Sequence, residues 1–117
     1  MYIDSPLTFD RKEGKTPGTL IFSLTGPLTL RNLFDFQSAL RSQQPEPEST
    51  VLDLTGVPYM DSAGMGLLVN YYVHCQRQGS KVLVAGVSPR LMELFKLTKV
   101  DTVIPLRDSY NAAEYEA

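Results

Sequence analysis

Near the start of the chain, apolar residues recur at a spacing typical of β-strands. In residues 19–25, apolar side chains recur at every second position and therefore lie on one face of a strand. Residues 7–11 predict a shorter strand, and the intervening residues 13–18 are rich in turn formers such as glycine and proline. We expect these two strands to pair antiparallel as a hairpin.

After this hairpin the hydrophobic period changes from that of a strand to that of a helix. Leu33, Phe36 and Leu40 recur at intervals of three and four residues, which predicts an amphipathic helix with an apolar stripe. Thr29 precedes Leu30, the first apolar residue of this segment, and threonine is a favourable N-cap. We therefore expect the helix to begin directly after Thr29.

The rest of the chain continues the alternation of strands and helices. The predicted elements are, in order, a buried strand at 51–55, a helix at 64–78 ended by Gly79, a strand at 81–87, a helix capped by Ser88, an edge strand at 103–106 and a terminal helix at 108–117. This alternation is typical of α/β proteins. The sequence thus predicts one domain, residues 1–117, with a mostly parallel sheet of four to five strands, an antiparallel N-terminal strand and about four helices.

Composition narrows the class of protein. The chain has 117 residues, 43% of them hydrophobic, and a formal net charge of −2, all ordinary for a globular domain. Its lysines and arginines are scattered, so nucleic acid is not an expected partner. The sequence lacks both the ~18 consecutive apolar residues of a membrane span and the pattern of a signal peptide. We expect a cytoplasmic protein with no membrane partner.

Only one cysteine and one histidine are present, which restricts metal and redox chemistry. Cys75 has no second cysteine for an internal disulfide, and Cys75 and His74 together are too few ligands for a zinc site. The helical pattern indicates a core position for Cys75 and a surface position for His74. No metal or cofactor is predicted.

The junction between the buried strand and the following helix holds the main candidates for function. Asp61 and Ser62 are both residue types that cap a helix by accepting a bond from a first-turn amide. Gly64 and Gly66 each cost roughly 1 kcal/mol relative to alanine inside a helix, which suggests a packing or access reason for them. We expect them to leave the first-turn amides, which attract anions, open to a partner or a phosphate.

Two residues near this junction are candidates for supporting roles. Asp53 is the only charge in the buried strand and lies toward its C-terminal end, where it is expected to orient the loop around Ser62. Met65, which lies beside the glycines, is expected to be partly exposed and to offer an apolar anchor to a partner.

Three roles are open for Ser62: a helix cap, a regulated site and a catalytic nucleophile. A nucleophile needs a base within hydrogen-bond reach. His74 lies twelve residues further along the same helix, ~18 Å away at 1.5 Å per residue. A G-x-S-x-G motif is also absent from the sequence. The residues themselves favour a cap or a regulated site over an enzyme.

The whole junction resembles the signature of the STAS domain, found in sulfate transporter tails and in bacterial anti-sigma factor antagonists. The family pattern is a strand V-L-D-L-S-G-V, then an apolar pair, then D-S-S/A-G-L/M-G. The corresponding residues here are Val51–Val57, Tyr59 and Met60, and Asp61–Gly66. A match over about sixteen positions is fairly specific.

For a stand-alone domain of this size, the resemblance implies an anti-sigma factor antagonist. Such a protein binds an anti-sigma factor that is also a serine kinase, and is released when that kinase, with ATP and Mg²⁺, phosphorylates the serine matching Ser62. The chain is then a substrate and not an enzyme. The implied partner-binding residues are Thr29, Asp61, Ser62, Ala63, Gly64, Met65 and Gly66.

One departure from the family leaves alternatives open. Family members often have an aspartate in the second strand-to-helix turn, where this chain has Thr29. The alternative is a STAS adaptor or scaffold that is not phosphorylated, in a signalling or transport-associated complex. A hydrolase using Ser62 would need a base from another chain. The sequence leaves open whether the chain forms a homodimer.

Overall fold

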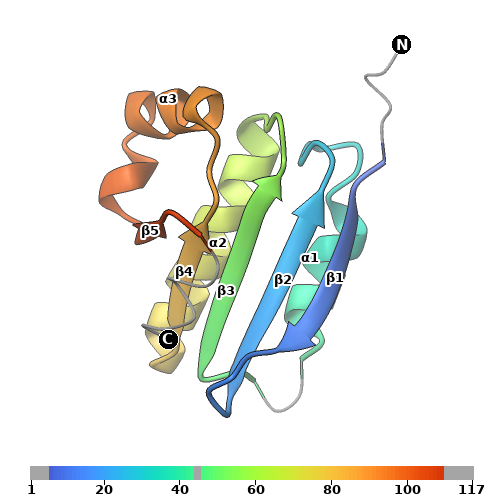
Figure 1. The fold of residues 1–117 in the computed structure, drawn as a ribbon, viewed down its shortest axis with the longest axis vertical. Helices are drawn as coiled ribbons and strands as arrows, with labels where there is room; N and C mark the ends of the chain where they lie inside the picture. Colours follow the sequence, from blue (N-terminus) through green and yellow to red (C-terminus); the bar gives the residue numbers. More distant parts are fainter. Residues whose placement is uncertain (1–5, 44–45, 110–117) are drawn as a thin grey trace.

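Five β-strands form one mixed sheet in the order β1-β2-β3-β4-β5 (Figure 1). β1 pairs antiparallel with β2, and all other neighbours pair in parallel. In this computed structural model, which describes residues 6–43 and 46–109, the strands are β1 (Thr8–Glu13), β2 (Thr19–Thr25), β3 (Ser49–Gly56), β4 (Lys81–Ala85) and β5 (Leu106–Arg107). The predicted α/β class and antiparallel N-terminal strand are confirmed.

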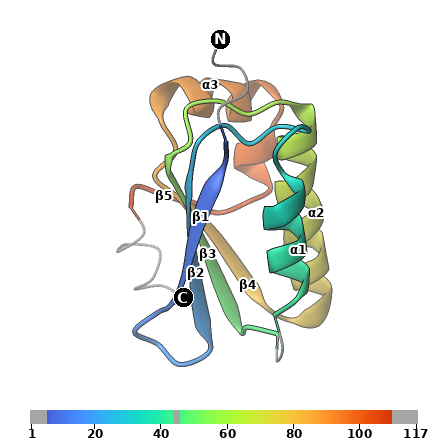
Figure 2. The same ribbon diagram turned by 90° about the vertical axis from the view of Figure 1, so that its right-hand side faces the viewer.

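Helices connect the parallel strands. They are α1 (Phe34–Arg41), α2 (Ser62–Gln78) and α3 (Pro89–Leu97), followed by the short 3₁₀ helix η2 (Val100–Thr102). α1 and α2 cover one face of the sheet, and α3 lies at the end of the sheet where β3 ends (Figures 1 and 2). The described residues contain three α-helices where about four were predicted, and residues 110–117 of the predicted terminal helix lie outside the described part. None of these helices is long and apolar enough to cross a bilayer.

The strand register aligns the core residues in layers. Phe22 of β2 lies opposite Leu52 of β3, which lies opposite Val84 of β4, and all three are fully buried against the helices. Neighbouring residues along each strand point to the opposite face, because side chains alternate in a strand. That face carries a second buried cluster of Ile21, Val51, Leu83 and Ala85.

The start of α1 differs from the prediction. Thr29 donates both its backbone N–H and its hydroxyl to the Asn32 Oδ1, at 2.8 and 3.2 Å, so a turn forms where a helix was expected. The helix begins only at Phe34, and Leu30 is 59% exposed. The prediction that Thr29 is the N-cap of this helix is therefore wrong. The predicted apolar stripe is nevertheless buried: Leu33, Phe36 and Leu40.

In the second half of the chain, glycine, serine and proline mark where strands and helices begin and end. β4 stops at Ala85 because Gly86 turns the chain with a φ of +72°. Ser88 accepts the Leu91 N–H at 3.2 Å, which confirms it as the cap of α3. The last strand is an edge strand as predicted, but it pairs as Leu106–Arg107, directly after Pro105.

Candidate functional site

Asp61 caps α2 and joins it to the turn before α1. Its backbone is extended, and its Oδ1 accepts the Gly64 N–H at 3.0 Å, the typical N-cap bond. Its Oδ2 accepts the Leu30 N–H at 3.1 Å. Both oxygens of the carboxylate thus stabilise the local backbone, and of the two candidate caps it is Asp61 that fills the role.

Ser62 is the first residue of α2 and is exposed to solvent. Within the described residues, its hydroxyl makes no hydrogen bond. Because Asp61 satisfies the cap, Ser62 is free of that structural task. A hydroxyl at this position is accessible to another macromolecule and lies at the positive end of the helix dipole.

The two glycines of the first turn have different surroundings. A Cβ on Gly64 would lie 2.2 Å from the Leu28 carbonyl oxygen and 2.8 Å from the Met60 Cγ, so a side chain cannot fit there. A Cβ on Gly66 would meet no atom within 4 Å. The prediction that both glycines keep amides open is wrong for Gly64, whose amide is bonded to Asp61 and whose small size serves packing. Only Gly66 leaves open surface.

Met65 lies in the core. It is only 8% exposed and belongs to the main hydrophobic cluster. Its predicted role as a partly exposed anchor is therefore wrong. Ala63 is half-buried against the same cluster. The large exposed apolar side chains near Ser62 are instead Tyr59 at 53% and Leu97 at 81%.

A wide groove runs from Ser62 between the start of α2 and α3, whose lining residues extend from Arg90 to Leu97. Its volume is about 840 Å³, and its polar lining consists of Asp61, Ser62, Arg90, Glu93 and Thr98. Its apolar lining consists of Tyr59, Met65, Val69, Leu91, Leu94 and Leu97, among others. The sequence did not predict that α3 residues line this groove, because the packing of α3 beside α2 is a long-range contact.

Asp53 is buried and binds the ends of the central strands together. Its carboxylate accepts the Ser23 hydroxyl at 3.3 Å, and the Thr55 hydroxyl and N–H at 2.6 and 3.1 Å. A Cβ on Gly86 would lie 3.0 Å from its Oδ1, so the chain after β4 passes close by. These hydrogen bonds hold strand ends, and none of them reaches Ser62.

Cys75 and His74 lie where they were predicted. Cys75 is buried, which raises the pKa of its thiol. His74 is on the surface, where its Nε2 pairs with Glu46 Oε1 at 2.8 Å. Among residues 6–43 and 46–109, no group of three His, Cys, Asp or Glu side chains could hold a metal ion.

This fold and this junction are those of the STAS domain family, to which the chain belongs. The family description "STAS domain" matches residues 12–113. Over 57 residues the chain is 35% identical to the anti-sigma-B factor antagonist of Listeria monocytogenes. That match covers 49% of this chain and 50% of the relative, so the chain spans about half the length of the curated relatives it matches first.

Solved structures confirm the fold. An anti-sigma factor antagonist from Mycobacterium paratuberculosis has a TM-score of 0.82 at 21% identity, and the match covers 95% of this chain and 92% of that one. The Bacillus cell fate determinant SpoIIAA in its phosphorylated form has a TM-score of 0.72 at 15% identity, with 94% and 100% coverage. The predicted family is confirmed by the family match to residues 12–113.

Proposed function

We propose that this chain is an anti-sigma factor antagonist, and that it binds its partner through Ser62 and the adjoining groove between α2 and α3. One observation carries the proposal. The Ser62 hydroxyl is exposed and has no hydrogen bond in the described part of the chain, and it lies on the rim of a large apolar groove. Such a side chain can enter an interface as a neutral hydroxyl and can exclude the partner once it carries a phosphate.

Phosphorylation of Ser62 would leave the fold intact. A phosphate adds about −1.5 to −2 charges, and the positive end of a helix dipole favours negative charge by ~0.3–1 kcal/mol. Arg90, an exposed cation that lines the same groove, can also attract the phosphate. The modified protein is therefore expected to stay folded.

The same charge would oppose complex formation. In a complex the phosphate must lose water beside an apolar surface, and it lies next to the carboxylate of Asp61. A penalty of ~3 kcal/mol would weaken binding by ~100-fold. Ser62 thus acts as a switch on affinity with little effect on stability.

The partner in this proposal is an anti-sigma factor with serine kinase activity in the cytoplasm. The kinase brings ATP and Mg²⁺, so the chain itself needs no cofactor and is not an enzyme. The names of the relatives support the partner class, and the phosphorylated form of SpoIIAA supports the modification for that neighbour. The proposed interface around Ser62 also includes Thr29, Asp61, Ala63, Gly64, Met65 and Gly66. Of these, Gly64 and Met65 are buried and support the surface from below.

A second candidate is a STAS adaptor that no kinase modifies. Thr29 favours it, since family members often carry an aspartate there, and both its N–H and its hydroxyl are bonded to Asn32. An adaptor would use the same groove without the switch.

Phosphorylation by the cognate anti-sigma kinase tests the proposal. Incubation with ATP should add one phosphate, and Ser62→Ala should abolish the mass change. An unmodified mass, under conditions where the kinase labels a known substrate, would favour the adaptor.

Binding measurements supply the second arm. Ser62→Ala should keep affinity for the anti-sigma factor, whereas Ser62→Asp should lower it by ~10–100-fold. Ser38→Asp is a matched control, because Ser38 is exposed on α1 and does not line the groove. Equal losses in Ser38→Asp and Ser62→Asp would contradict a local effect at the groove.

A further inference from the structure

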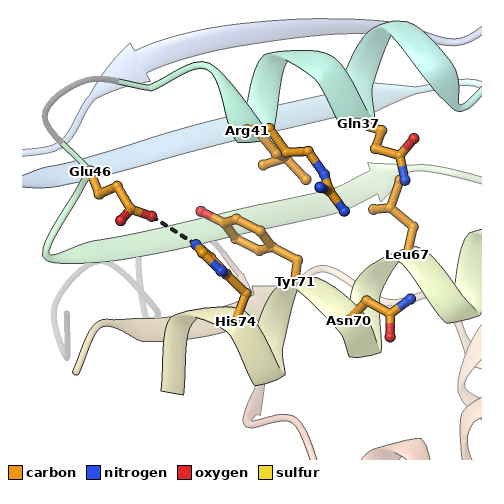
Figure 3. Close-up of a pocket in the computed structure, with 8 residues that line it drawn as sticks. Gln37, Arg41, Glu46, Leu67, Asn70, Tyr71 and His74 are labelled. Atoms are coloured by element: carbon orange, nitrogen blue, oxygen red, sulfur yellow. Dashed lines mark hydrogen bonds and ion pairs between the residues drawn. The ribbon is translucent and has the colours of Figure 1, made fainter. Parts of the chain in front are cut away.

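A second pocket opens on another face of α2, between α2 and α1 (Figure 3). Its volume is about 330 Å³, at the lower end of the range for small-molecule sites. α1 and α2 each contribute residues spaced three or four apart, which places them on one side of the helix. The lining residues are Gln37, Leu40, Arg41, Glu46, Leu67, Asn70, Tyr71 and His74.

The floor of this pocket is apolar and held in place by the core. Leu40 and Leu67 are buried members of the main hydrophobic cluster. The Tyr71 ring packs against the same cluster, and its hydroxyl shares a hydrogen bond of 2.9 Å with the Thr50 Oγ1 of β3. The Tyr71 and His74 rings stack, with centroids 6.5 Å apart and planes inclined by 28°. A flat apolar group would therefore find a preformed surface.

The rim offers a cation that the described residues leave without a partner. The Arg41 guanidinium points toward the pocket in Figure 3, and in residues 6–43 and 46–109 it makes no hydrogen bond or ion pair. Glu46, the one carboxylate among the eight lining residues, is bonded to His74 instead. The side-chain amides of Gln37 and Asn70 border the same space.

We propose that this pocket binds a small organic carboxylate with an aromatic or branched apolar body. Arg41 presents the planar fork of donors that matches a carboxylate, and the amides of Gln37 and Asn70 can donate to the same oxygens. The apolar body of the ligand lies over Leu40, Leu67 and Tyr71. The charge of the ligand complements the guanidinium, while its body matches the floor.

This site is separate from the proposed switch. Its lining contains none of the residues of the groove beside Ser62, so the two cavities use different faces of α2. The inference therefore does not depend on phosphorylation or on the identity of the protein partner.

Titration of the full chain with benzoate, followed by ¹H–¹⁵N NMR, tests the proposal. Benzoate should shift the amide signals of the lining residues and saturate in the millimolar range or below. Benzamide has the same ring without the charge and should bind at least ~10-fold more weakly. Benzamide binding as tightly as benzoate, or no saturable shifts with benzoate, would overturn the carboxylate specificity.

Two arginine variants locate the binding charge. Arg41→Gln should weaken benzoate by ~10-fold or more, whereas Arg77→Gln, on an exposed arginine of α2 outside the pocket, should leave affinity unchanged within ~2-fold. Arg41→Lys keeps the charge without the fork and should fall between the two, which also covers a folding failure of Arg41→Gln. Equal affinities in the Arg41 and Arg77 variants would refute the site.

Ser62→Ala separates this proposal from the function argued above. The variant should bind benzoate as the unmodified chain does, because Ser62 lies outside the pocket. A loss of benzoate affinity in Ser62→Ala would place the ligand in the groove and overturn the assignment.

Discussion

Alanine substitutions at Gly64 and Gly66 should change the stability of the fold in opposite directions. Both glycines lie in the first turns of α2, two residues apart. Replacing glycine by alanine inside a helix stabilises by ~1 kcal/mol when nothing else changes. The surroundings decide whether that gain is realised, so the pair is an internal control for the packing described above.

At Gly64 the added methyl would overlap the backbone. It would lie 2.2 Å from the carbonyl oxygen of Leu28, which cannot rotate away as a flexible side chain could, and 2.8 Å from the Met60 Cγ. The carbonyl of Leu28 also accepts the Asp61 N–H at 3.3 Å, so any shift disturbs the cap. Overpacking typically costs ~1–3 kcal/mol. Taking the upper value, because backbone must move, and subtracting the helical gain leaves a net loss of ~2 kcal/mol.

At Gly66 the added methyl would meet no atom within 4 Å. The full helical gain should appear, so Gly66→Ala is expected to be ~0.5–1 kcal/mol more stable than the natural chain. The two variants then differ by ~3 kcal/mol, which corresponds to melting temperatures on the order of 10 °C apart.

Urea denaturation at constant m-value measures both variants. Gly64→Ala with the stability of the natural chain would refute the close approach to Leu28, and a destabilised Gly66→Ala would refute the open surface. Affinity for the proposed anti-sigma factor partner adds a functional readout. If Gly66 is kept for partner access, Gly66→Ala should bind more weakly despite being more stable; unchanged affinity would contradict that reason for the glycine.

Two further variants test the polar contacts of α2. Asp61→Ala removes the acceptor of both Gly64 and Leu30 and should cost ~1–2 kcal/mol, whereas Asp61→Asn should recover most of the loss; equal losses in urea melts would show that capping is not the cause. Tyr71→Phe removes the bond to Thr50 and should cost ~1 kcal/mol at neutral pH. Burial raises the pKa of the Tyr71 phenol above its ordinary value, so the folded chain keeps this proton longer than the unfolded chain does, and stability is lost as pH rises above ~10. Tyr71→Phe should reduce that alkaline loss, and an identical slope in both proteins would contradict the assignment.

Local patterns predicted much of the fold. Strands β2, β3 and β4 are apolar runs that are buried on both faces of the sheet, and such runs can be recognised in the sequence. The cap and first proline of α3 identify its start. The start of α1 could not be predicted in this way. Both Thr29 and Asn32 are residue types that form turns and caps. A turn forms here because the Asn32 Oδ1 accepts hydrogen bonds from the amide and the hydroxyl of Thr29.

The wrong predictions for Met65 and Gly64 have a common cause, since both residues make tertiary contacts that their local sequence does not reveal. The sequence predicts a partly exposed Met65 because it lies in the first turn beside glycines, and open amides at Gly64 and Gly66 because these residues lack side chains. In the fold, the carbonyl of Leu28 approaches Gly64, and Met65 packs into the main hydrophobic cluster. Local sequence patterns also do not predict that α3 lines the groove, where Leu97 is the most exposed apolar residue.

The division of roles between Asp61 and Ser62 explains how a charge at this junction can act on binding and spare the fold. An N-cap contributes ~0.5–2 kcal/mol, a sizeable part of the ~5–15 kcal/mol that holds a domain together. If the Ser62 hydroxyl were that cap, phosphorylation would alter the bond that starts α2. Because Asp61 makes the bond to Gly64 and Ser62 makes none within the described residues, a phosphate added to Ser62 would leave the N-cap bond of α2 in place.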